Sequence, residues 1–294
     1  MRTTALSISA RGRAADYVAL AKPRLNLLVV ASALAGYLMA RGDTSNVFVL
    51  LLTIVGTALV AGGASALNQV VERERDGLMR RTRLRPLPDG RLAPADAAIY
   101  GALLSCAGLA ILAAGVNALA AGVALATLVS YAAIYTPLKH RTSFATVIGA
   151  IPGALPPVIG WAAATGALSQ GAWVLFGIVF LWQLPHFLAI AWMYRDDYAR
   201  GGFPMLPVIE PSGHSTARQA VIYTAALLPF ALAPTLVGLA GAVYFAGALI
   251  LTLLFLGMSL QFARTRAVAD ARRLFFSSIV YLPLIWVLMI VDRI

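Results

Sequence analysis

Three polar residues stand four positions apart where a long apolar run of the sequence ends. Asn68, Glu72 and Asp76 occupy positions i, i+4 and i+8. On a helix each step of four residues turns by about 400°, so the three side chains lie on one stripe and point into the same space. Two carboxylates and an amide oxygen suit a hard divalent cation, and Mg²⁺ in particular keeps coordination sites for water and for substrate phosphate oxygens. The spacing therefore predicts a magnesium site.

Four arginines follow this stripe directly, namely Arg80, Arg81, Arg83 and Arg85. Guanidinium groups bind phosphate through two parallel hydrogen bonds, so acidic and then basic residues form the order that a metal diphosphate requires. The alternative is a charged helix end at the membrane surface, with internal salt bridges and arginines attracted to anionic lipid. Asn68 argues against that alternative, because it lies inside the apolar run, where a polar group is costly and indicates function by default.

A second polar series runs from Gln183 through His186 to the adjacent pair Asp196 and Asp197. Pro185 precedes His186 and is expected to kink the helix there, since proline removes a backbone hydrogen bond. A histidine in such a span is a hydrogen-bonded core residue, an axial ligand or contact of a metal porphyrin, or a proton acceptor. Adjacent aspartates point about 100° apart on a helix, so we expect only one of the pair to face the site.

The composition indicates which elements must hold these residues. Hydrophobic residues make up 60% of the 294-residue chain and charged residues 12%, whereas a soluble domain has about 45–50% apolar and about 25% charged residues. With about 20 apolar residues for each span, the sequence predicts an all-α polytopic membrane protein with nine transmembrane helices. The predicted spans are residues 25–40, 46–71, 94–114, 117–136, 144–165, 169–193, 219–238, 241–262 and 274–291.

The net charge of +11 comes from 23 Lys and Arg residues against 12 Asp and Glu residues. In a soluble protein this excess would suggest nucleic acid as a partner, but in a membrane protein it reports orientation, because basic residues are retained on the cytoplasmic side. Nine spans with the amino terminus in the cytoplasm leave 21 of the 23 basic residues inside, with only Arg41 and Arg293 outside. The inner segments are residues 1–24, 72–93, 137–143, 194–218 and 263–273. We therefore expect a cytoplasmic amino-terminal segment, residues 1–24, followed by one nine-helix domain, residues 25–294, and no role for nucleic acid.

Together these motifs resemble the UbiA superfamily of intramembrane prenyltransferases, and within it the branch that farnesylates haem. The matching blocks are Lys22-Pro23-Arg24, Asn68-x3-Glu72-x3-Asp76 with Arg81-Thr82 and Arg85-Pro86-Leu87, Tyr135-Thr136-x-Leu138-Lys139-x-Arg141-Thr142, Gly149-x3-Gly153 with Pro156-Pro157, and Trp182-Gln183-x-Pro185-His186-Phe187 with Asp197-Tyr198. Two positions depart from the superfamily pattern. Glu72 stands where relatives often have Asp, and His186 stands near one acid of a second acidic motif that is incomplete here. The second departure puts metal ligation at that motif in doubt and favours haem as the acceptor.

The resemblance implies nine helices around a central cavity, with both acidic loops over its cytoplasmic mouth. It implies transfer of a farnesyl group from farnesyl diphosphate to the 2-vinyl group of haem B, with addition of water, to give haem O and diphosphate. The alternatives are prenyl transfer to an aromatic quinone precursor and, from another class of protein, a transporter with a polar vestibule. The sparse ionisable residues in the outer halves of the spans oppose the transporter.

The resemblance also assigns roles to individual residues. Asn68, Glu72, Asp76 and Asp197 are expected to be catalytic, and Mg²⁺ is the expected cofactor, held by these residues and by Asp196. The residues expected to bind the diphosphate are Lys22, Arg24, Arg81, Arg85, Lys139 and Arg141, and those expected to contact haem are Gln183 and His186. The implied surroundings are a bacterial cytoplasmic (inner) membrane with the active site facing the cytoplasm. The implied partners that receive the product are a haem A synthase or assembly factors of a terminal oxidase.

Overall fold

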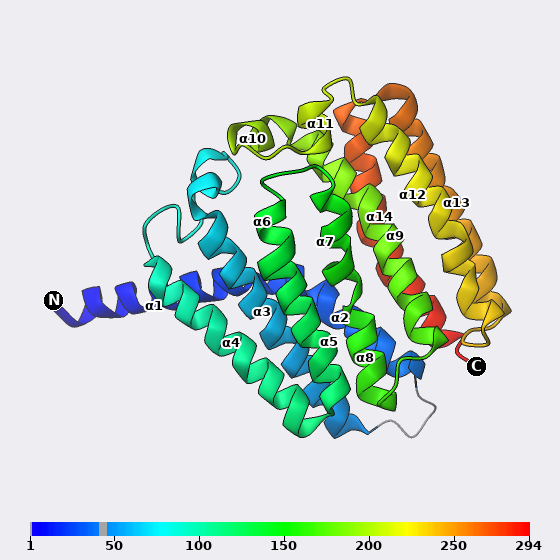
Figure 1. Cartoon of the computed structure of the whole chain (residues 1–294), viewed down its shortest axis with the longest axis horizontal. Coiled ribbons are helices and arrows are strands. Elements are labelled where there is room, and N and C mark those ends of the chain that lie inside the picture. Colours follow the sequence, from blue (N-terminus) through cyan, green and yellow to red (C-terminus); the bar gives the residue numbers. More distant parts are fainter. Residues whose placement is uncertain (1, 41–45) are drawn as a thin grey trace.

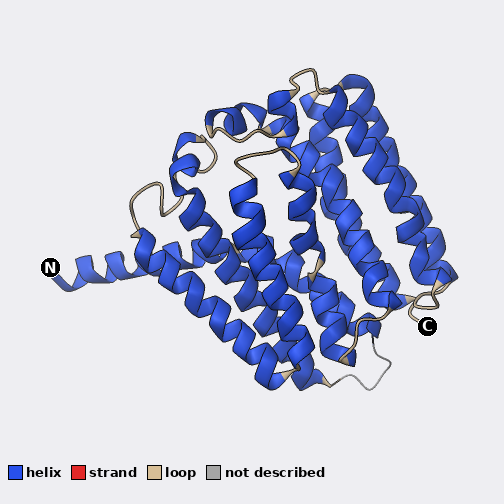
Figure 2. Ribbon diagram, in the orientation of Figure 1, coloured by secondary structure: helices blue, strands red, loops and turns tan. Residues whose placement is uncertain are grey.

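A computed structural model describes residues 2–40 and 46–294, with side chains from residue 12 onward, as a bundle of helices (Figures 1 and 2). Within these ranges nine helical segments are long and apolar enough to cross a membrane, which agrees with the nine predicted spans. They cover Pro23–Ala40, Val47–Leu78, Pro94–Gly115, Ala118–Leu138, Ala145–Thr165, Gln170–Met193, His214–Leu236, Ala242–Thr265 and Val268–Val291. The predicted outer connection that carries Arg41 lies outside the described residues.

The bounds of the individual elements are as follows. They are α1 (Arg2–Ala21), α2 (Pro23–Ala40), α3 (Val47–Leu78), α4 (Pro94–Gly115), α5 (Ala118–Val129), the π-helix η1 (Ser130–Tyr135), α6 (Thr136–Leu138), α7 (Ala145–Ala154), α8 (Pro156–Thr165), α9 (Gln170–Met193), α10 (Arg195–Arg200), α11 (Leu206–Ile209), α12 (His214–Leu236), α13 (Ala242–Thr265) and α14 (Val268–Val291). Among the described residues the only strand-like feature is an isolated bridge between Ala240 and Arg293.

Helix α3 extends about two turns beyond its predicted membrane span. Its first turn is capped by Asn46, whose side-chain oxygen accepts hydrogen bonds from the amides of Phe48 and Val49 at 3.0 and 3.2 Å, as helix caps usually do. The helix ends only where Met79 becomes extended. One continuous helix thus carries the whole polar stripe from membrane depth to the end of the bundle.

Helices α2 and α8 approach so closely that two of their positions admit only glycine. A Cβ atom on Gly160 would lie 1.8 Å from the carbonyl oxygen of Ala33, and one on Gly36 would lie 2.0 Å from that of Pro157. Small residues of this kind let the backbones of membrane helices approach each other and gain dispersion contacts. This packing holds α2, which begins at the site described below, firmly against the centre of the bundle.

The span Ala118–Leu138 changes its winding in the middle. Helix α5 passes into the π-helix η1, which is followed by the short α6. The Thr136 amide bonds to the carbonyl oxygen of Tyr131, five residues earlier, and the Thr136 hydroxyl donates to the same oxygen at 2.8 Å. A π segment holds one extra residue in its turn and is often found at functional sites.

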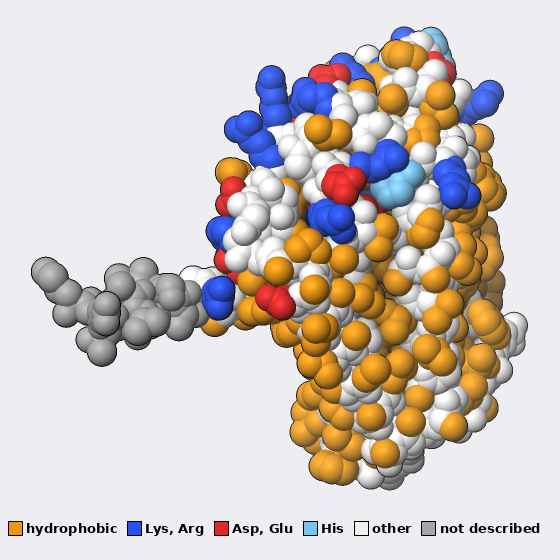
Figure 3. All heavy atoms as spheres, turned by 60° about the vertical axis from the view of Figure 1, so that its left-hand side comes forward, with side chains coloured by type: hydrophobic (Ala, Val, Ile, Leu, Met, Phe, Trp, Pro, Cys, Tyr) orange, Lys and Arg blue, Asp and Glu red, His pale blue; other side chains and the backbone are white. Residues whose placement is uncertain are grey.

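Short helices and loops cover one end of the bundle, where α10, α11 and the turns of residues 79–93 lie together (Figure 1). Lys and Arg side chains gather here, while hydrophobic side chains cover the flanks of the helices (Figure 3). We call this the basic end. The predicted amino-terminal segment is helical as α1, and its second half joins the bundle: Leu20 is fully buried, the Tyr17 ring lies 5.0 Å from that of Tyr100, and Asp16 pairs with Arg91.

Candidate active site

The predicted polar stripe on α3 is buried at the basic end. Asn68, Glu72 and Asp76 have exposed fractions of 4%, 3% and 1%. Buried carboxylates are stable only when they are paired or bind a cation. The burial of all three polar side chains on one helix face therefore marks them as candidates for a site rather than as a solvated helix end.

Each member of the stripe has a partner from another element. The Glu72 carboxylate accepts hydrogen bonds from Lys139 Nζ at 3.1 and 3.3 Å, and Asp76 Oδ2 pairs with Arg85 at 2.6 Å. Asn68 donates its amide to Thr136 Oγ1 at 3.2 Å, which leaves its carbonyl oxygen as an acceptor. Arg85 and Lys139, which were expected to bind a diphosphate, thus form ion pairs with Asp76 and Glu72, which were expected to bind a metal.

The donor set fits a magnesium ion in chemical type. Within the described residues no three His, Cys, Asp or Glu side chains form a ready-made metal cluster. However, Mg²⁺ is commonly held by one or two carboxylates together with water and substrate phosphates. Glu72 and Asp76 supply two carboxylates and Asn68 supplies an amide oxygen, all of them hard ligands.

The second acidic loop, residues 194–218, contacts the first acidic loop, residues 72–93, through Asp197. This residue is 8% exposed and accepts hydrogen bonds from the Arg80 amide at 3.1 Å and from the side chain of Arg200. Burial acts to raise the pKa of the Asp197 carboxyl, but the hydrogen bonds from Arg200 and from the Arg80 backbone outweigh it and hold this pKa below its ordinary value. Asp197 therefore stays ionised beside the loop that follows Asp76.

Asp196 points away from this contact. Its side chain is 86% exposed, and its nearest cation is the neighbouring Arg195 at 4.0 Å. The expectation that Asp196 lies with the metal ligands does not agree with this placement. The reason is the rotation of about 100° between neighbouring residues on α10, which buries one aspartate of the pair and exposes the other.

Lys22 occupies a strained turn between α1 and α2. Its φ is 47°, in the left-handed region that a residue with a side chain rarely adopts, and its carbonyl oxygen accepts from the amides of Leu25 and Asn26. Burial lowers the pKa of Lys22 to about 7, with a further contribution from Arg85, while Glu72 and Asp76 act in the opposite direction. The strained backbone and the lowered pKa make Lys22 a candidate for a functional role.

The other predicted cations divide into two groups. Arg81 lies over the rings of Tyr194 and Tyr198, at 4.8 and 5.6 Å, and so bridges the two loops. Arg24 and Arg141 are exposed, and neither contacts the stripe or Asp197 among the described residues. The structure thus gathers Lys22, Arg85 and Lys139 at the stripe, with Arg81 nearby, and leaves the remaining two at the surface.

A cavity of about 330 Å³ continues from this site into the bundle. Its wall is mostly apolar and comes from α2, α3, α5, η1, α7, α8 and α9. Gln183, which the resemblance assigned to haem, lines this cavity and is held in the wall by a hydrogen bond from its Nε2 to the Ala150 carbonyl oxygen at 2.7 Å. Thr57 also faces the cavity, and its buried hydroxyl has no hydrogen-bond partner. Such a cavity suits a ligand whose polar head lies at Lys22 and whose apolar chain extends into the bundle.

Two tyrosines of η1 belong to this site as well. Tyr131 and Tyr135 line the cavity with ring centroids 5.5 Å apart. Tyr135 is part of a motif recognised in the sequence, whereas Tyr131 was missed. The signal that could have found Tyr131 is its position four residues before Tyr135 and eight before Lys139, but the π turn changes which faces these spacings select.

His186 lies on a different side of α9. Its Nδ1 is 2.7 Å from Ser278 Oγ on α14, and its ring stacks on Trp182 at 5.5 Å and on Phe275 at 5.0 Å. The next residue, Phe187, lines the cavity, but His186 itself does not. A kink was predicted at Pro185, and helix α9 continues through this residue to Met193.

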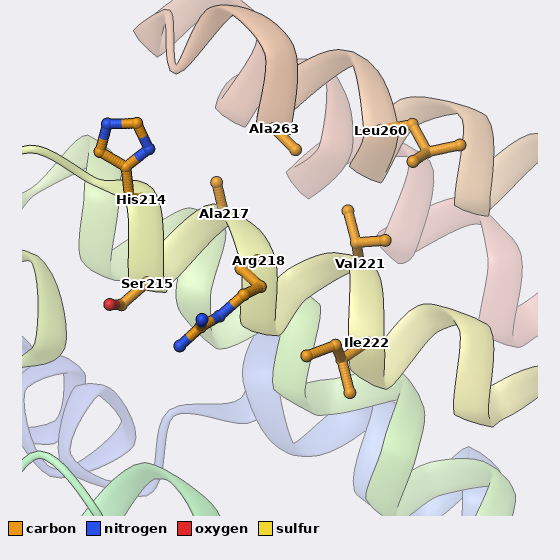
Figure 4. A pocket seen from close by; sticks show the side chains of 8 residues that line it. All are labelled: His214, Ser215, Ala217, Arg218, Val221, Ile222, Leu260 and Ala263. Carbon is orange, nitrogen blue, oxygen red and sulfur yellow. The ribbon is translucent and has the colours of Figure 1, made fainter.

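A wider depression of about 490 Å³ lies elsewhere, between α12 and α13 (Figure 4). It is lined by His214, Arg218 and apolar side chains such as Val221 and Leu260. None of the predicted site residues contributes to it. The cavity lined by Lys22 and Tyr135, which both lie close to the buried stripe, is therefore the better candidate for the active site.

Comparison with known proteins identifies the family to which this chain belongs. A model of the UbiA prenyltransferase family matches residues 29–280. A protein named protoheme IX farnesyltransferase from Solibacter usitatus is 50% identical over 95% of this chain and 98% of its own length. One of the same name from Salinibacter ruber is 46% identical over 94% of this chain and 98% of its own length. Both relatives therefore match essentially from end to end.

Solved structures show the same fold at low sequence identity. A digeranylgeranylglyceryl phosphate synthase superposes with a TM-score of 0.79 at 16% identity, covering 96% of this chain and 98% of its own. A UbiA homologue from Archaeoglobus fulgidus, solved with GPP and Mg²⁺, gives 0.64 at 14% identity, covering 93% and 99%. The family match and the relatives from Solibacter usitatus and Salinibacter ruber, not the fold alone, favour an enzyme over the transporter alternative. The chain belongs to the UbiA prenyltransferase family, within the group of the protoheme IX farnesyltransferases.

Proposed function

We propose that this chain transfers the farnesyl group of farnesyl diphosphate to the 2-vinyl group of haem B, with addition of water, to give haem O and diphosphate. The observation that carries the proposal is the buried stripe of Asn68, Glu72 and Asp76, with cations on both carboxylates, close to Lys22, which lines an apolar cavity. The names of the relatives from Solibacter usitatus and Salinibacter ruber support the choice of substrates.

In this proposal Asn68, Glu72 and Asp76 hold Mg²⁺, and Asp197 completes the ligand set from the second loop. When bound by these residues, Mg²⁺ would supply a Lewis acid that neutralises the charge of the leaving diphosphate. Arg85 and Lys139, which rest on Asp76 and Glu72 in the structure, turn to the phosphate oxygens when the substrate arrives. Lys22 and Arg81 add positive charge to the same clamp, in a partly dry site where it is most effective.

The cavity gives the farnesyl chain its place and keeps water from the allylic cation. Its apolar wall extends from Lys22 past Thr57, so the chain lies below the diphosphate. Haem B approaches the first farnesyl carbon with its 2-vinyl group, and Gln183 and His186 are the residues that we assign to haem. The product then passes to a haem A synthase or to assembly factors of a terminal oxidase.

The charge distribution supports one orientation in the membrane. The chain is an integral membrane protein, and its Lys and Arg side chains gather at the basic end. Because basic residues are retained on the cytoplasmic side, we infer that the amino terminus and the active site face the cytoplasm. The bacterial relatives favour the bacterial inner membrane as the location.

The deciding experiment incubates the purified full chain with haem B, farnesyl diphosphate and Mg²⁺ and follows the products by mass spectrometry. We expect the hydroxyethylfarnesyl derivative of haem, with its oxygen labelled when the reaction is run in ¹⁸O water. A parallel incubation replaces haem with 4-hydroxybenzoate, an aromatic quinone precursor. A prenylated aromatic ring without any farnesylated haem would contradict the proposal.

The state of Lys22 predicts a pH dependence for substrate binding. With its pKa at about 7, Lys22 is increasingly neutral above pH 7, whereas diphosphate binding requires the charged form. The KM for farnesyl diphosphate should therefore rise by up to about tenfold for each pH unit above 7. Arginine stays charged over this range, so the Lys22→Arg variant should lack this rise. Parallel profiles for the two proteins, measured at saturating haem B and Mg²⁺, would show that Lys22 does not bind the diphosphate.

A bulky side chain introduced deep in the cavity should change which prenyl diphosphate the protein uses. Ala61 lines the cavity, seven residues or about 10 Å along α3 from Asn68. A phenyl ring in the Ala61→Phe variant would occupy the space of the distal farnesyl carbons. We expect kcat/KM for farnesyl diphosphate to fall more than about tenfold, while the shorter geranyl diphosphate is still used.

A matched control for this variant lies on the same helix. Val55 is 46% exposed on the flank of α3 and does not line the cavity. The Val55→Phe variant adds a ring of the same size outside the bundle, so its preference between geranyl and farnesyl diphosphate should equal that of the wild type. An equal loss of both substrates in Ala61→Phe would mean that the chain binds elsewhere.

A further inference from the structure

The hydroxyl group of Ser278 on α14 makes two short contacts in the interior of the bundle. Its Oγ lies 2.6 Å from the carbonyl oxygen of Phe275 and 2.7 Å from Nδ1 of His186. Ser278 itself is fully buried. No residue of the proposed diphosphate site takes part in this arrangement, so it requires its own explanation.

Counting hydrogens decides which atom donates in each contact. A serine hydroxyl carries one hydrogen, and the Phe275 carbonyl oxygen has none to offer. Two oxygens 2.6 Å apart without a hydrogen between them would repel each other, so the hydroxyl must donate to Phe275. His186 Nδ1 must then donate to Ser278 Oγ. In a neutral imidazole the other nitrogen, Nε2, consequently keeps its lone pair.

Neighbouring side chains also fix the orientation of the imidazole ring. Trp182 stacks on it with an interplanar angle of 24°, and Phe275 with one of 29°. Trp182 is itself anchored, since its indole nitrogen donates to the Ser278 carbonyl oxygen at 2.8 Å. Within the described residues no hydrogen-bond donor serves Nε2, and His186 is only partly buried. The ring is thus held with one nitrogen bound and the other available.

We propose that Ser278 is a positioning residue that holds His186 in its Nδ1–H tautomer, so that Nε2 binds the iron of the haem substrate. Haem iron is the part of that substrate that takes a neutral imidazole nitrogen as a ligand. Metal-binding histidines characteristically donate their second nitrogen to a fixed acceptor, which sets the tautomer and the ring plane. The inference rests on the proposed function, because it takes haem B as the acceptor.

The test is a titration of the purified full chain with ferric haem B, followed by the Soret absorption band and by electron paramagnetic resonance. We expect the wild type to give the spectrum of imidazole-ligated haem and the His186→Ala variant to lose it. The Ser278→Ala variant should keep His186 but weaken haem binding by about tenfold, the usual effect of removing a partner of a metal-binding histidine, and give a mixture of ligation states.

The neighbouring Ser277 provides a matched control. Its hydroxyl donates to Leu274 three residues earlier, just as Ser278 donates to Phe275, but it does not contact His186. The Ser277→Ala variant should therefore bind haem with the wild-type spectrum. In protein labelled with ¹⁵N-histidine, the nitrogen shifts of His186 should report a protonated Nδ1 in the wild type and in Ser277→Ala, and a tautomer mixture in Ser278→Ala.

The haem O assay separates the inference from the proposed function. If haem O is produced but the His186→Ala variant keeps the wild-type iron spectrum, the role of Nε2 is wrong while the proposed function stands. If ligation is lost equally in Ser277→Ala and Ser278→Ala, Ser278 has no special positioning role. If neither haem O nor haem binding is detected in the wild type, the proposed function fails and the inference fails with it.

Discussion

Replacing Asp76 by asparagine should reduce haem farnesylation by a factor of about 100 to 1,000, the usual loss when one stabilising group of a preorganised site is removed. Asp76 is 1% exposed and pairs with Arg85. The Asp76→Asn variant keeps the shape of the side chain but removes the negative charge that we assign to Mg²⁺ binding. Product formation, measured by mass spectrometry over a range of Mg²⁺ concentrations, should remain low at every concentration. We expect the same loss for Asn68→Ala.

Asp89 offers a control for this variant in the same loop. Its side chain is 42% exposed, and its partner is Arg91. The Asp89→Asn variant removes an equal charge from the basic end without touching the stripe, so its turnover should stay near that of the wild type. Normal turnover in a correctly folded Asp76→Asn protein would remove Asp76 from the metal site.

The largest effect on stability is expected at the contact between α2 and α8. In the Gly160→Ala variant the added methyl group would meet the Ala33 carbonyl oxygen at 1.8 Å, and since this neighbour is backbone, a whole helix must move. Overpacking of this kind lowers the free energy of unfolding by about 1–3 kcal/mol or more. The midpoint of thermal unfolding in detergent, followed by tryptophan fluorescence, should fall by roughly 5–10 °C.

The substitution Gly122→Ala on α5 should leave the midpoint of thermal unfolding unchanged or raise it. A Cβ atom there meets nothing within 4 Å, and alanine favours a helix over glycine by up to about 1 kcal/mol. The difference between the two variants therefore isolates the contact of α2 with α8 from the helix propensity of alanine. Equal unfolding midpoints for Gly160→Ala and the wild type would contradict this prediction, because they would mean that α2 and α8 can move apart without a loss of stability.

The parts of this molecule that the sequence predicted are those that depend on local patterns. Apolar run lengths and the placement of charges were sufficient for nine spans, because membrane insertion depends on these quantities. The stripe from Asn68 to Asp76 was predictable because α3 stays helical through Leu78. A strict period of four on a continuous helix leaves little freedom for the direction of its side chains.

The remaining features depend on contacts between distant segments. That His186 faces Ser278 on α14, and not the cavity, follows from how α9 is rotated in the bundle, which no local spacing determines. The pairing of Lys139 with Glu72 joins residues 67 positions apart. The sequence predicted that only one of the two adjacent aspartates faces the site, but not which one. The packing of α10 against the turns of residues 79–93 decides this: Asp197 is buried and Asp196 is exposed.

The π turn of η1 makes the position of Lys139 depend on the number of residues that precede it. The extra residue between Val129 and Thr136 shifts the phase of everything that follows it by about 100° relative to α5. Deleting one alanine, Ala132 or Ala133, would restore a regular helix and rotate Lys139 away from Glu72. We therefore expect the site to depend more on the number of residues in this stretch than on the identity of its alanines, because a deletion would move Lys139 away from Glu72.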